Sequence, residues 1–111
     1  MNQQLAPIAI EELVPPLWEI GWARGIERTT LRAHLGQPLY VETDTHRTFG
    51  GEEDWWAYRT PAGSIIAICL RVPYQDAVVC SSEQSSASRA ENANALLQPW
   101  PVELFEEPWL R

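Results

Sequence analysis

The sequence predicts an α+β domain, in which two or three short helices pack on one face of an antiparallel β-meander of three to five strands. Alternating apolar runs follow one another between residues 39 and 81, turn motifs separate them, and helix-like apolar spacing lies outside this region. With 111 residues, 45% of them apolar, the chain can form one domain over 1–111 with its own core.

The N-terminal part of the chain predicts short helices. Residues 1–7 are expected to form a loose polar leader, and apolar residues then recur every three or four positions. The pair Pro15-Pro16 cannot lie inside a helix, because proline lacks an N–H and restricts the residue before it. We therefore expect a helical turn before the two prolines and a second helix over 16–24. Trp18 and Trp22 would share one face of that helix and pack on the sheet.

A third helix is predicted over 29–35, and its boundaries are the best defined in the chain. Thr29 or Thr30 can accept a backbone hydrogen bond at its N-terminus. Gly36 stands where many helices end in a residue with positive φ, and Pro38 prevents the helix from continuing.

Four strand candidates follow, each bounded by turn residues. They cover residues 39–43, 54–60, 64–72 and 77–81. The third candidate is the strongest, because Ile66, Ile68 and Leu70 alternate with residues of the other face. Consecutive hairpins give an antiparallel sheet, which leaves one face for the helices.

The C-terminal part begins with a serine-rich loop, expected to be exposed, and a helix near residues 88–97. Residues 98–111 then form an extended tail rich in proline and tryptophan. We expect the tail to pack on its own domain through Trp100, Leu104, Phe105 and Trp109. Alternatively, Trp100 and Trp109 anchor a partner protein.

The charge of the chain favours a basic protein as partner. Eight arginines and no lysine stand against 15 acidic residues, which gives a net charge of −7. Nucleic acids and anionic membranes are unsuitable partners, since their binding needs clustered cations. The N-terminus has neither the basic region of a signal peptide nor an uninterrupted apolar span. We therefore expect a cytoplasmic protein, and the arginine bias favours a bacterial source.

An acidic segment beside two tryptophans is the candidate protein-binding site. Its residues are Glu42, Asp44, Glu52, Glu53, Asp54 and Trp55. If the loop over 44–53 connects neighbouring strands, the five carboxylates converge on one sheet edge, where they can steer a basic partner while an exposed ring supplies contact area. The alternative is that the acids are simply solvated and that one of the two tryptophans, Trp55 or Trp56, belongs to the core.

Catalytic and metal sites have less support. A pair of catalytic carboxylates would have to include Glu53 or Asp54, but neighbouring strand residues point to opposite faces. Asp44, His46 and Glu52 lack the close His and Cys spacing of zinc sites. His34 is expected near the C-terminus of a helix, where a positive charge on its ring would interact favourably with the helix dipole. We therefore predict no catalytic residue, no metal and no cofactor.

The two cysteines are expected to face each other across a hairpin. If residues 73 and 76 pair at its turn, Cys69 lies opposite Cys80. In a cytosolic protein we expect reduced, half-buried thiols.

Residues Gly25–Pro38, followed by an extended run and Trp56-Ala57-Tyr58-Arg59, resemble the helix-then-meander unit of two families. These are the β-lactamase inhibitor protein family and the small lipoprotein of bacterial outer-membrane assembly, in which a helix ends in Leu-Gly-x-Pro and a Trp-x-Tyr strand follows. The resemblance covers about residues 25–72. It implies a helical layer on a curved antiparallel sheet in proteins that bind other proteins. The chain differs in having no signal or lipobox cysteine.

The small size, the acidity and the segment Gly50–Trp56 also resemble small bacterial immunity proteins. That resemblance implies a non-enzymatic protein that neutralises a cognate toxin, here through the acidic edge. An accessory or chaperone-like adaptor for a secreted effector is the alternative, and a small enzyme using Glu53 or Asp54 is the third possibility.

Overall fold

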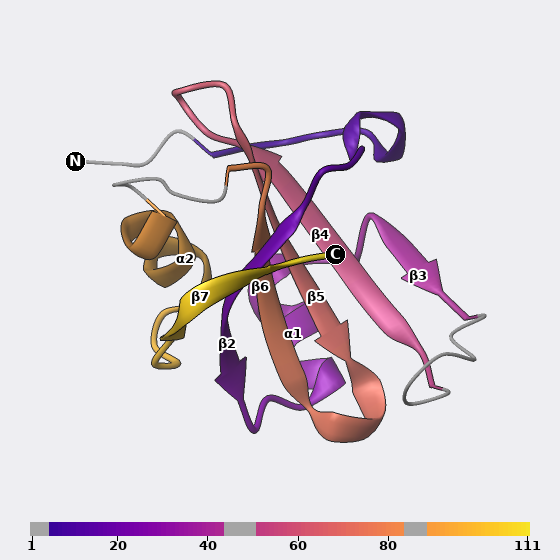
Figure 1. Cartoon of the computed structure of the whole chain (residues 1–111). Coiled ribbons are helices and arrows are strands. Elements are labelled where there is room, and N and C mark those ends of the chain that lie inside the picture. Colours follow the sequence, from indigo (N-terminus) through magenta and orange to yellow (C-terminus); the bar gives the residue numbers. More distant parts are fainter. Residues whose placement is uncertain (1–4, 44–50, 84–88) are drawn as a thin grey trace.

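Seven antiparallel strands in one sheet and two α-helices form a single compact α+β domain (Figure 1), which confirms the predicted fold class. The computed structural model describes residues 5–43, 51–83 and 89–111. The strands are β1 (Ala6–Pro7), β2 (Trp18–Arg24), β3 (Tyr40–Glu42), β4 (Glu53–Arg59), β5 (Ile65–Arg71), β6 (Asp76–Ser81) and β7 (Glu103–Leu110). The helices are α1 (Arg28–Leu35) and α2 (Arg89–Leu97), with 3-10 turns η1 (Ile10–Glu12) and η2 (Val72–Tyr74).

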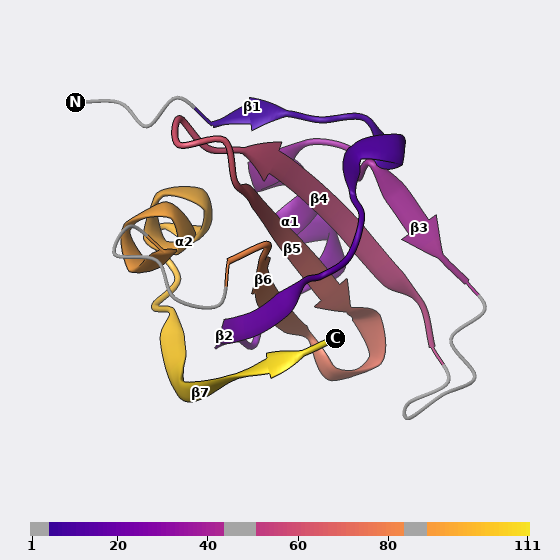
Figure 2. The same ribbon diagram turned by 45° about the horizontal axis from the view of Figure 1, so that its top comes forward.

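The sheet contains the predicted meander and three strands that the sequence did not predict. Its order is β1-β4-β5-β6-β2-β7, and β3 also pairs with β4. Strands β3 to β6 therefore follow one another as neighbours, as predicted. Strand β2 joins β6, β7 joins β2, and β1 joins β4. Figure 2 shows β7 at the edge of the sheet opposite β1 and β3.

The two faces of the sheet support two separate cores. On the helix face, Leu31 of α1 and Leu96 and Leu97 of α2 pack against alternate residues of β4, β5 and β6. On the opposite face, Ile8 and Leu17 cover a second cluster that contains both cysteines. Both helices thus lie on one face, as predicted, and α1 lies behind the sheet in Figure 1.

The predicted helix over 16–24 is wrong, because Trp18–Arg24 forms β2. Ile20 has no partner on β6, so a bulge separates Glu19 from Gly21. The bulge adds one residue and places Ile20 and Ala23, three positions apart, in the same core. Buried residues three positions apart are also typical of a helix. This spacing explains why the sequence pattern wrongly predicted a helix in which Trp18 and Trp22 share one face.

Gly21 lets β7 lie close to β2. A Cβ atom at this position would stand 2.6 Å from the carbonyl oxygen of Glu103 and 3.1 Å from Cδ2 of Leu104. A glycine inside a strand often marks such a close approach of another backbone. Strand β7 therefore depends on the absence of a side chain at this position.

The ends of α1 differ in part from the prediction. The helix begins one residue earlier than expected, with Glu27 as the N-cap, and no side chain caps it, so the expected cap by Thr29 or Thr30 is wrong. Gly36 has the predicted positive φ, at 91°, and its N–H donates to the carbonyl oxygen of Arg32 at 2.8 Å.

The terminal segments are more ordered than predicted. Ala6 and Pro7 of the expected loose leader pair with β4. The helical turn expected before the prolines is present as η1. The tail is extended as predicted, but Glu103–Leu110 pairs with β2 as a strand of the sheet.

Residues 84–88 of the predicted serine-rich loop lie outside the described residues. No helix within the described ranges is long and apolar enough to cross a membrane.

The expected pairing of Cys69 with Cys80 is wrong by two residues. Cys69 lies opposite Val78, and Cys80 lies opposite Ala67. The hairpin closes on the pair Arg71 and Asp76, because η2 and a left-handed Gln75 form the connection. Both cysteines are free thiols and fully buried, not half-buried as expected.

Candidate functional site

The N-terminal end of β4 and the strand beside it bring together the described members of the predicted acidic site. Glu42 lies opposite Glu53 across the β3–β4 pair, and Val41 lies opposite Asp54. Asp44 lies outside the described residues. The carboxylates therefore meet at one end of the sheet, but consecutive residues of β4 point to opposite faces and divide the site in two.

Asp54 is fully buried on the helix face and bound by two arginines of α1. Its Oδ2 accepts hydrogen bonds from Nε of Arg28 and Nε of Arg32, both at 2.9 Å. Its Oδ1 accepts from the Nη2 atoms of the same residues at 2.8 and 3.0 Å. Glu52 adds an ion pair to Arg28 at 2.7 Å. The two arginines reach one carboxylate because they are four positions apart on a helix.

These contacts determine the charge of Asp54. Burial alone would raise the pKa of Asp54, but hydrogen bonds from Arg28 and Arg32, together with their positive charges, hold the pKa below its ordinary value. The hydrogen bond to Asp54 raises the pKa of Arg28 in turn. The negative charge of Asp54 is thus compensated inside the domain.

Glu53 belongs to a second cluster on the opposite face. Its Oε1 accepts a hydrogen bond from Nε1 of Trp55 at 3.2 Å, and its Oε2 lies 3.6 Å from Nη2 of Arg111. Arg111 also donates to Oε2 of Glu19 at 2.7 Å and lies 4.9 Å from the ring centre of Trp55. The C-terminal end of β7 is therefore fixed to the sheet through Arg111.

Burial contradicts the expectation that a tryptophan is exposed beside the acids. Trp55 is 7% exposed and Trp56 is 3% exposed. Trp56 donates its indole N–H to the carbonyl oxygen of Gly36 at 3.0 Å. With Glu53 and Asp54 also buried, Glu42 and Glu52 are the accessible carboxylates among the described residues of the predicted site, and Glu52 is bound to Arg28.

The structure also shows where the residues considered for catalysis and for metal binding lie. Glu53 and Asp54 lie on opposite faces, as expected, and each contacts arginine. No cluster of three possible metal ligands occurs among the described residues, whereas Asp44 and His46 lie outside them. His34 contacts the carbonyl oxygen of Leu96 at 2.9 Å.

Burial affects the protonation of both thiols. Burial raises the pKa of Cys80 to about 12 and also raises the pKa of Cys69 well above its ordinary value. A cysteine with a raised pKa is protonated at pH 7, and this disfavours the thiolate that nucleophilic catalysis requires.

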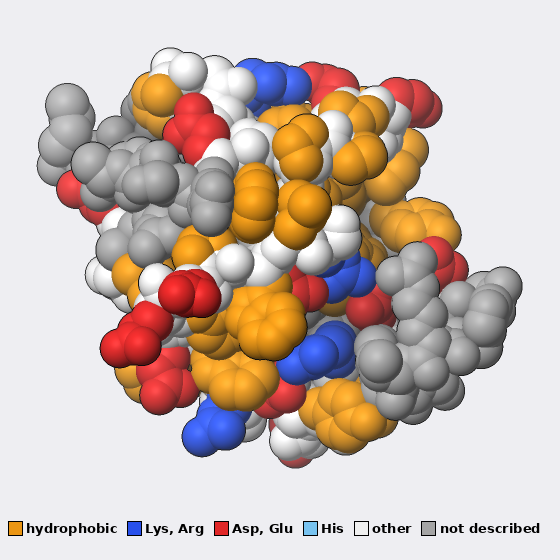
Figure 3. All heavy atoms as spheres, in the orientation of Figure 1, with side chains coloured by type: hydrophobic (Ala, Val, Ile, Leu, Met, Phe, Trp, Pro, Cys, Tyr) orange, Lys and Arg blue, Asp and Glu red, His pale blue; other side chains and the backbone are white. Residues whose placement is uncertain are grey.

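Strand β7 carries the two most exposed large apolar side chains of the described residues, Trp109 and Leu110, together with acids. Trp109 is 69% exposed, Leu110 is 60% exposed and Leu104 is 39% exposed. We call residues Glu103–Leu110 the β7 strip. Figure 3 shows hydrophobic side chains gathered where β7 crosses the sheet, with acidic side chains beside them. Glu106 and Glu107 are exposed and make no ion pair within the described part of the chain.

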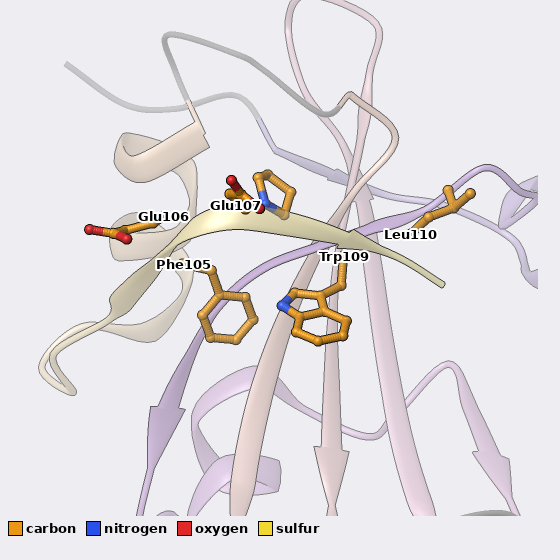
Figure 4. A pocket seen from close by; sticks show the side chains of 6 residues that line it. Phe105, Glu106, Glu107, Trp109 and Leu110 are labelled. Atoms are coloured by element: carbon orange, nitrogen blue, oxygen red, sulfur yellow. The ribbon is translucent and has the colours of Figure 1, made fainter.

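The shape of the β7 strip comes from a bend in the strand. Strand β7 pairs with β2 at Glu103 and Leu104 and again at Trp109 and Leu110, but residues 105–108 lie opposite the bulge of β2. An open hollow of about 630 Å³ is lined by Phe105, Glu106, Glu107, Pro108, Trp109 and Leu110. In Figure 4 the rings of Phe105 and Trp109 lie on the same side of the strand.

Trp22 supports one side of the β7 strip. Its ring contacts Phe105 edge to face, with 5.5 Å between the ring centres. Its indole N–H donates to Oε1 of Glu103 at 2.9 Å, and Arg24 lies 5.2 Å from its ring centre. The Phe105 ring is therefore held in place by a contact within the domain.

The sequence analysis gave Trp109, together with Trp100, as a partner-binding residue only as an alternative to packing of the tail, and it did not include Glu106 and Glu107 in that surface. The tail pairs with its own domain as expected, while the ring of Trp109 does not pack as predicted. The signal that was overlooked is the run Glu106-Glu107-Pro108-Trp109, in which acids and proline break the apolar alternation of a buried strand.

Comparisons with protein-family models, with curated proteins and with solved structures give no match to this chain.

Proposed function

We propose that this chain is a non-enzymatic cytoplasmic protein that neutralises a bacterial toxin by covering a basic surface of it with the β7 strip. The observation that carries the proposal is the exposure of Trp109, Leu110 and Leu104 on one edge strand that also presents Glu106 and Glu107. Aromatic side chains next to acids fit a protein interface, in which the rings supply buried area and the charges steer the partner.

The distribution of compensated charge supports this location. Asp54 and Glu53 contact arginines of their own chain, and so does Glu52. Glu106 and Glu107 have no such counter-ion among the described residues. With a net charge of −7, the long-range field attracts basic proteins, and these two carboxylates are placed to meet them.

The features of the β7 strip favour a partner that contacts its side chains over a partner that adds a strand to the edge of the sheet. Strand β7 is the last strand of the sheet order and has β2 as its neighbour. However, Pro108 has no N–H to donate, and the bend over 105–108 interrupts a regular edge. Proline, bends and charges are features that block edge-to-edge pairing of sheets.

The test is a capture experiment with matched variants. The tagged protein is incubated with extract of its own host at low and moderate salt, and captured proteins are identified by mass spectrometry. The test variant carries Glu106→Gln and Glu107→Gln. The control carries Glu11→Gln and Glu27→Gln, which remove the same charge from two exposed residues outside the strip.

We expect one stoichiometric basic partner with the wild type and the control, and slower association with the test variant at low salt. Inhibition of the partner's toxic activity by the wild type would support neutralisation. A partner that keeps full activity in the complex would favour an adaptor instead. Equal association rates for the test variant and the control would remove the β7 strip from the proposal.

A further inference from the structure

We infer that Arg111 closes a covered modification site, in which Cys69 and Cys80 react with small disulfides once the C-terminal end of β7 separates from the sheet. Both cysteines are free thiols, and neither side chain is exposed. The inference concerns the face of the sheet opposite the helices, and it does not depend on the proposed function.

The register of four strands places the two thiols between Trp55 and Glu19. Cys69 of β5 lies opposite Trp55 of β4, and Cys80 of β6 lies opposite Glu19 of β2. The order of these strands in the sheet is β4-β5-β6-β2. Directly opposed residues share a face of the sheet, and both cysteines belong to the same apolar cluster as Trp55. The four side chains therefore form a band across one face.

Arg111 spans this band. Its Nη1 donates to Oε2 of Glu19 at 2.7 Å, and its guanidinium carbon lies 4.9 Å from the ring centre of Trp55. Because β5 and β6 separate β2 from β4, a guanidinium that contacts both residues lies over the strands that carry the thiols. The backbone N–H of Arg111 also donates to the carbonyl oxygen of Leu17 at 2.8 Å. Figures 1 and 2 show this end of β7 in front of the sheet, on the side away from α1.

The protonation of the thiols reflects the same arrangement. Burial raises the pKa of Cys80 to about 12 and raises the pKa of Cys69, whereas the positive charge of Arg111 acts on both thiols in the opposite direction. Burial is the largest cause for each cysteine. Access of water after the end of β7 separates would therefore lower both pKa values, although the charge of Arg111 moves away, and would favour the reactive thiolates.

Few contacts hold the C-terminal end of β7. Trp109 and Leu110 pair with β2, but residues 105–108 lie opposite the bulge of that strand. The side chains of Trp109 and Leu110 are 69% and 60% exposed, so they add little to either core. A segment with few buried contacts opens at a lower cost than the whole domain. The contacts of Arg111 are therefore an important part of what keeps the thiols covered.

The reaction that follows from this opening is thiol–disulfide exchange. The cysteine loses its proton to water, and its thiolate attacks one sulfur of the small disulfide. A new S–S bond forms as the S–S bond of the reagent breaks, and the second sulfur of the reagent leaves as a thiolate. The cysteine sulfur is thereby oxidised and the leaving sulfur is reduced.

The register also predicts the product. Cys69 lies opposite Val78 and Cys80 lies opposite Ala67, so the two cysteines are diagonal neighbours. The Cα atoms of diagonal neighbours are about 7–8 Å apart, whereas cysteines more than about 7 Å apart cannot be bridged without backbone movement. We therefore expect mixed disulfides with the reagent and no bond between Cys69 and Cys80.

The experiment measures the rate of modification of the full-length folded protein. The probe is a water-soluble aromatic disulfide in excess at about pH 8, where ordinary thiols are partly ionised. Absorbance of its released thiolate gives the rate, and mass spectrometry of peptides identifies the modified cysteine. The test variant is Arg111→Gln. The control is Arg24→Gln, which removes the same charge and a similar contact, because Arg24 lies 5.2 Å from the ring centre of Trp22.

We expect Arg111→Gln to react at least about tenfold faster than the wild type, because it loses the charge-assisted hydrogen bond that closes the end of β7. Glu19→Gln should react faster by a smaller factor, since Arg111 keeps its contacts with Glu53 and Trp55. Arg24→Gln should react at the rate of the wild type.

Low concentrations of urea distinguish local opening from unfolding of the domain. We expect the wild-type rate to rise by less than about twofold in about 1 M urea, because local opening exposes little new surface, whereas a rate governed by global unfolding would rise about fivefold or more. The faster rate of Arg111→Gln should show the same weak dependence on urea.

The inference is overturned if Arg111→Gln and Arg24→Gln react at equal rates. It is also overturned if the wild-type rate follows the urea dependence of global unfolding, because the thiols would then react only in the unfolded chain. If Arg111→Gln does not fold, Glu19→Gln is compared with Arg24→Gln instead, and equal rates of these two variants would have the same meaning.

Discussion

Two segments of this protein have nearly the same sequence but opposite environments. Glu52-Glu53-Asp54-Trp55 spans the N-terminal end of β4, which starts at Glu53, and Glu106-Glu107-Pro108-Trp109 lies in β7. In the first segment Asp54 is fully buried and Trp55 is 7% exposed. In the second, Trp109 is 69% exposed. The difference follows from position in the sheet, because β4 has neighbours on both sides, whereas β7 is the last strand of the order.

Arginine contacts account for the rest of the difference. Arg28 and Arg32 reach Asp54 from a helix, and Arg111 reaches Glu53 from the end of the chain. The number of acidic residues in a segment therefore does not show which of their carboxylates are accessible and lack a counter-ion. The availability of a charge depends on long-range contacts, and these distinguish a structural cluster in β4 from an accessible one in β7.

The largest expected effect comes from Asp54→Asn. The variant leaves Arg28 and Arg32 beside a buried neutral amide, so we expect the free energy of unfolding to fall by about 3–5 kcal/mol. Glu106→Gln is the matched control in β7, and it should change the free energy by less than about 0.5 kcal/mol. Urea unfolding measures both. Equal effects of the two variants would abolish the distinction between the two segments.

Gly21→Ala tests how β7 is held at the edge. The new Cβ would stand 2.6 Å from the carbonyl oxygen of Glu103, so β2 and β7 must move apart. We expect a loss of about 1–3 kcal/mol in the free energy of unfolding. Hydrogen exchange of the backbone amides should show faster opening of β7 than of β5. Unchanged protection of β7 would contradict the close approach at Gly21.

A smaller, pH-dependent effect separates the charge of Asp54 from its packing. Its pKa is lowered in the folded protein, because the two arginines outweigh the burial that would raise it. The resulting stability is complete above the unfolded pKa of about 3.9 and is lost as the pH falls through the folded pKa. The difference in unfolding free energy between wild type and Asp54→Asn should thus be constant from about pH 7 to pH 5 and narrow below about pH 4. If the difference in unfolding free energy between the two proteins does not change in acid, the loss caused by Asp54→Asn comes from packing alone and not from the charge of Asp54.

The meander was predictable because its signals are local. Alternation in β4 to β6 and the glycine that ends α1 are visible in neighbouring residues. Strand β2 was not predictable in the same way, since its bulge at Ile20 imitates helical spacing. The pairing of β7 with β2 joins residues far apart in the chain, and no local pattern encodes that contact.

The candidate site was only partly predictable for the same reason. The sequence correctly indicated that Glu42 and Glu53 would meet, because adjacent strands of a meander have a defined neighbour. It could not indicate that α1 would direct Arg28 and Arg32 at Asp54, or that Trp55 would be covered by Arg111. Burial of Trp55 and exposure of Trp109 both depend on these long-range contacts.

The smallest expected effect concerns Glu52, which directly precedes β4. Glu52 precedes Asp54 by two residues and also binds Arg28, but its side chain is 45% exposed. Exposed ion pairs contribute little because solvent screens them, so Glu52→Gln should lower the free energy of unfolding by less than about 1 kcal/mol. Added salt should reduce this loss further, while the loss caused by Asp54→Asn should change little. A loss for Glu52→Gln as large as that for Asp54→Asn would mean that the whole acidic segment acts as one buried network, and that burial of Asp54 does not set it apart.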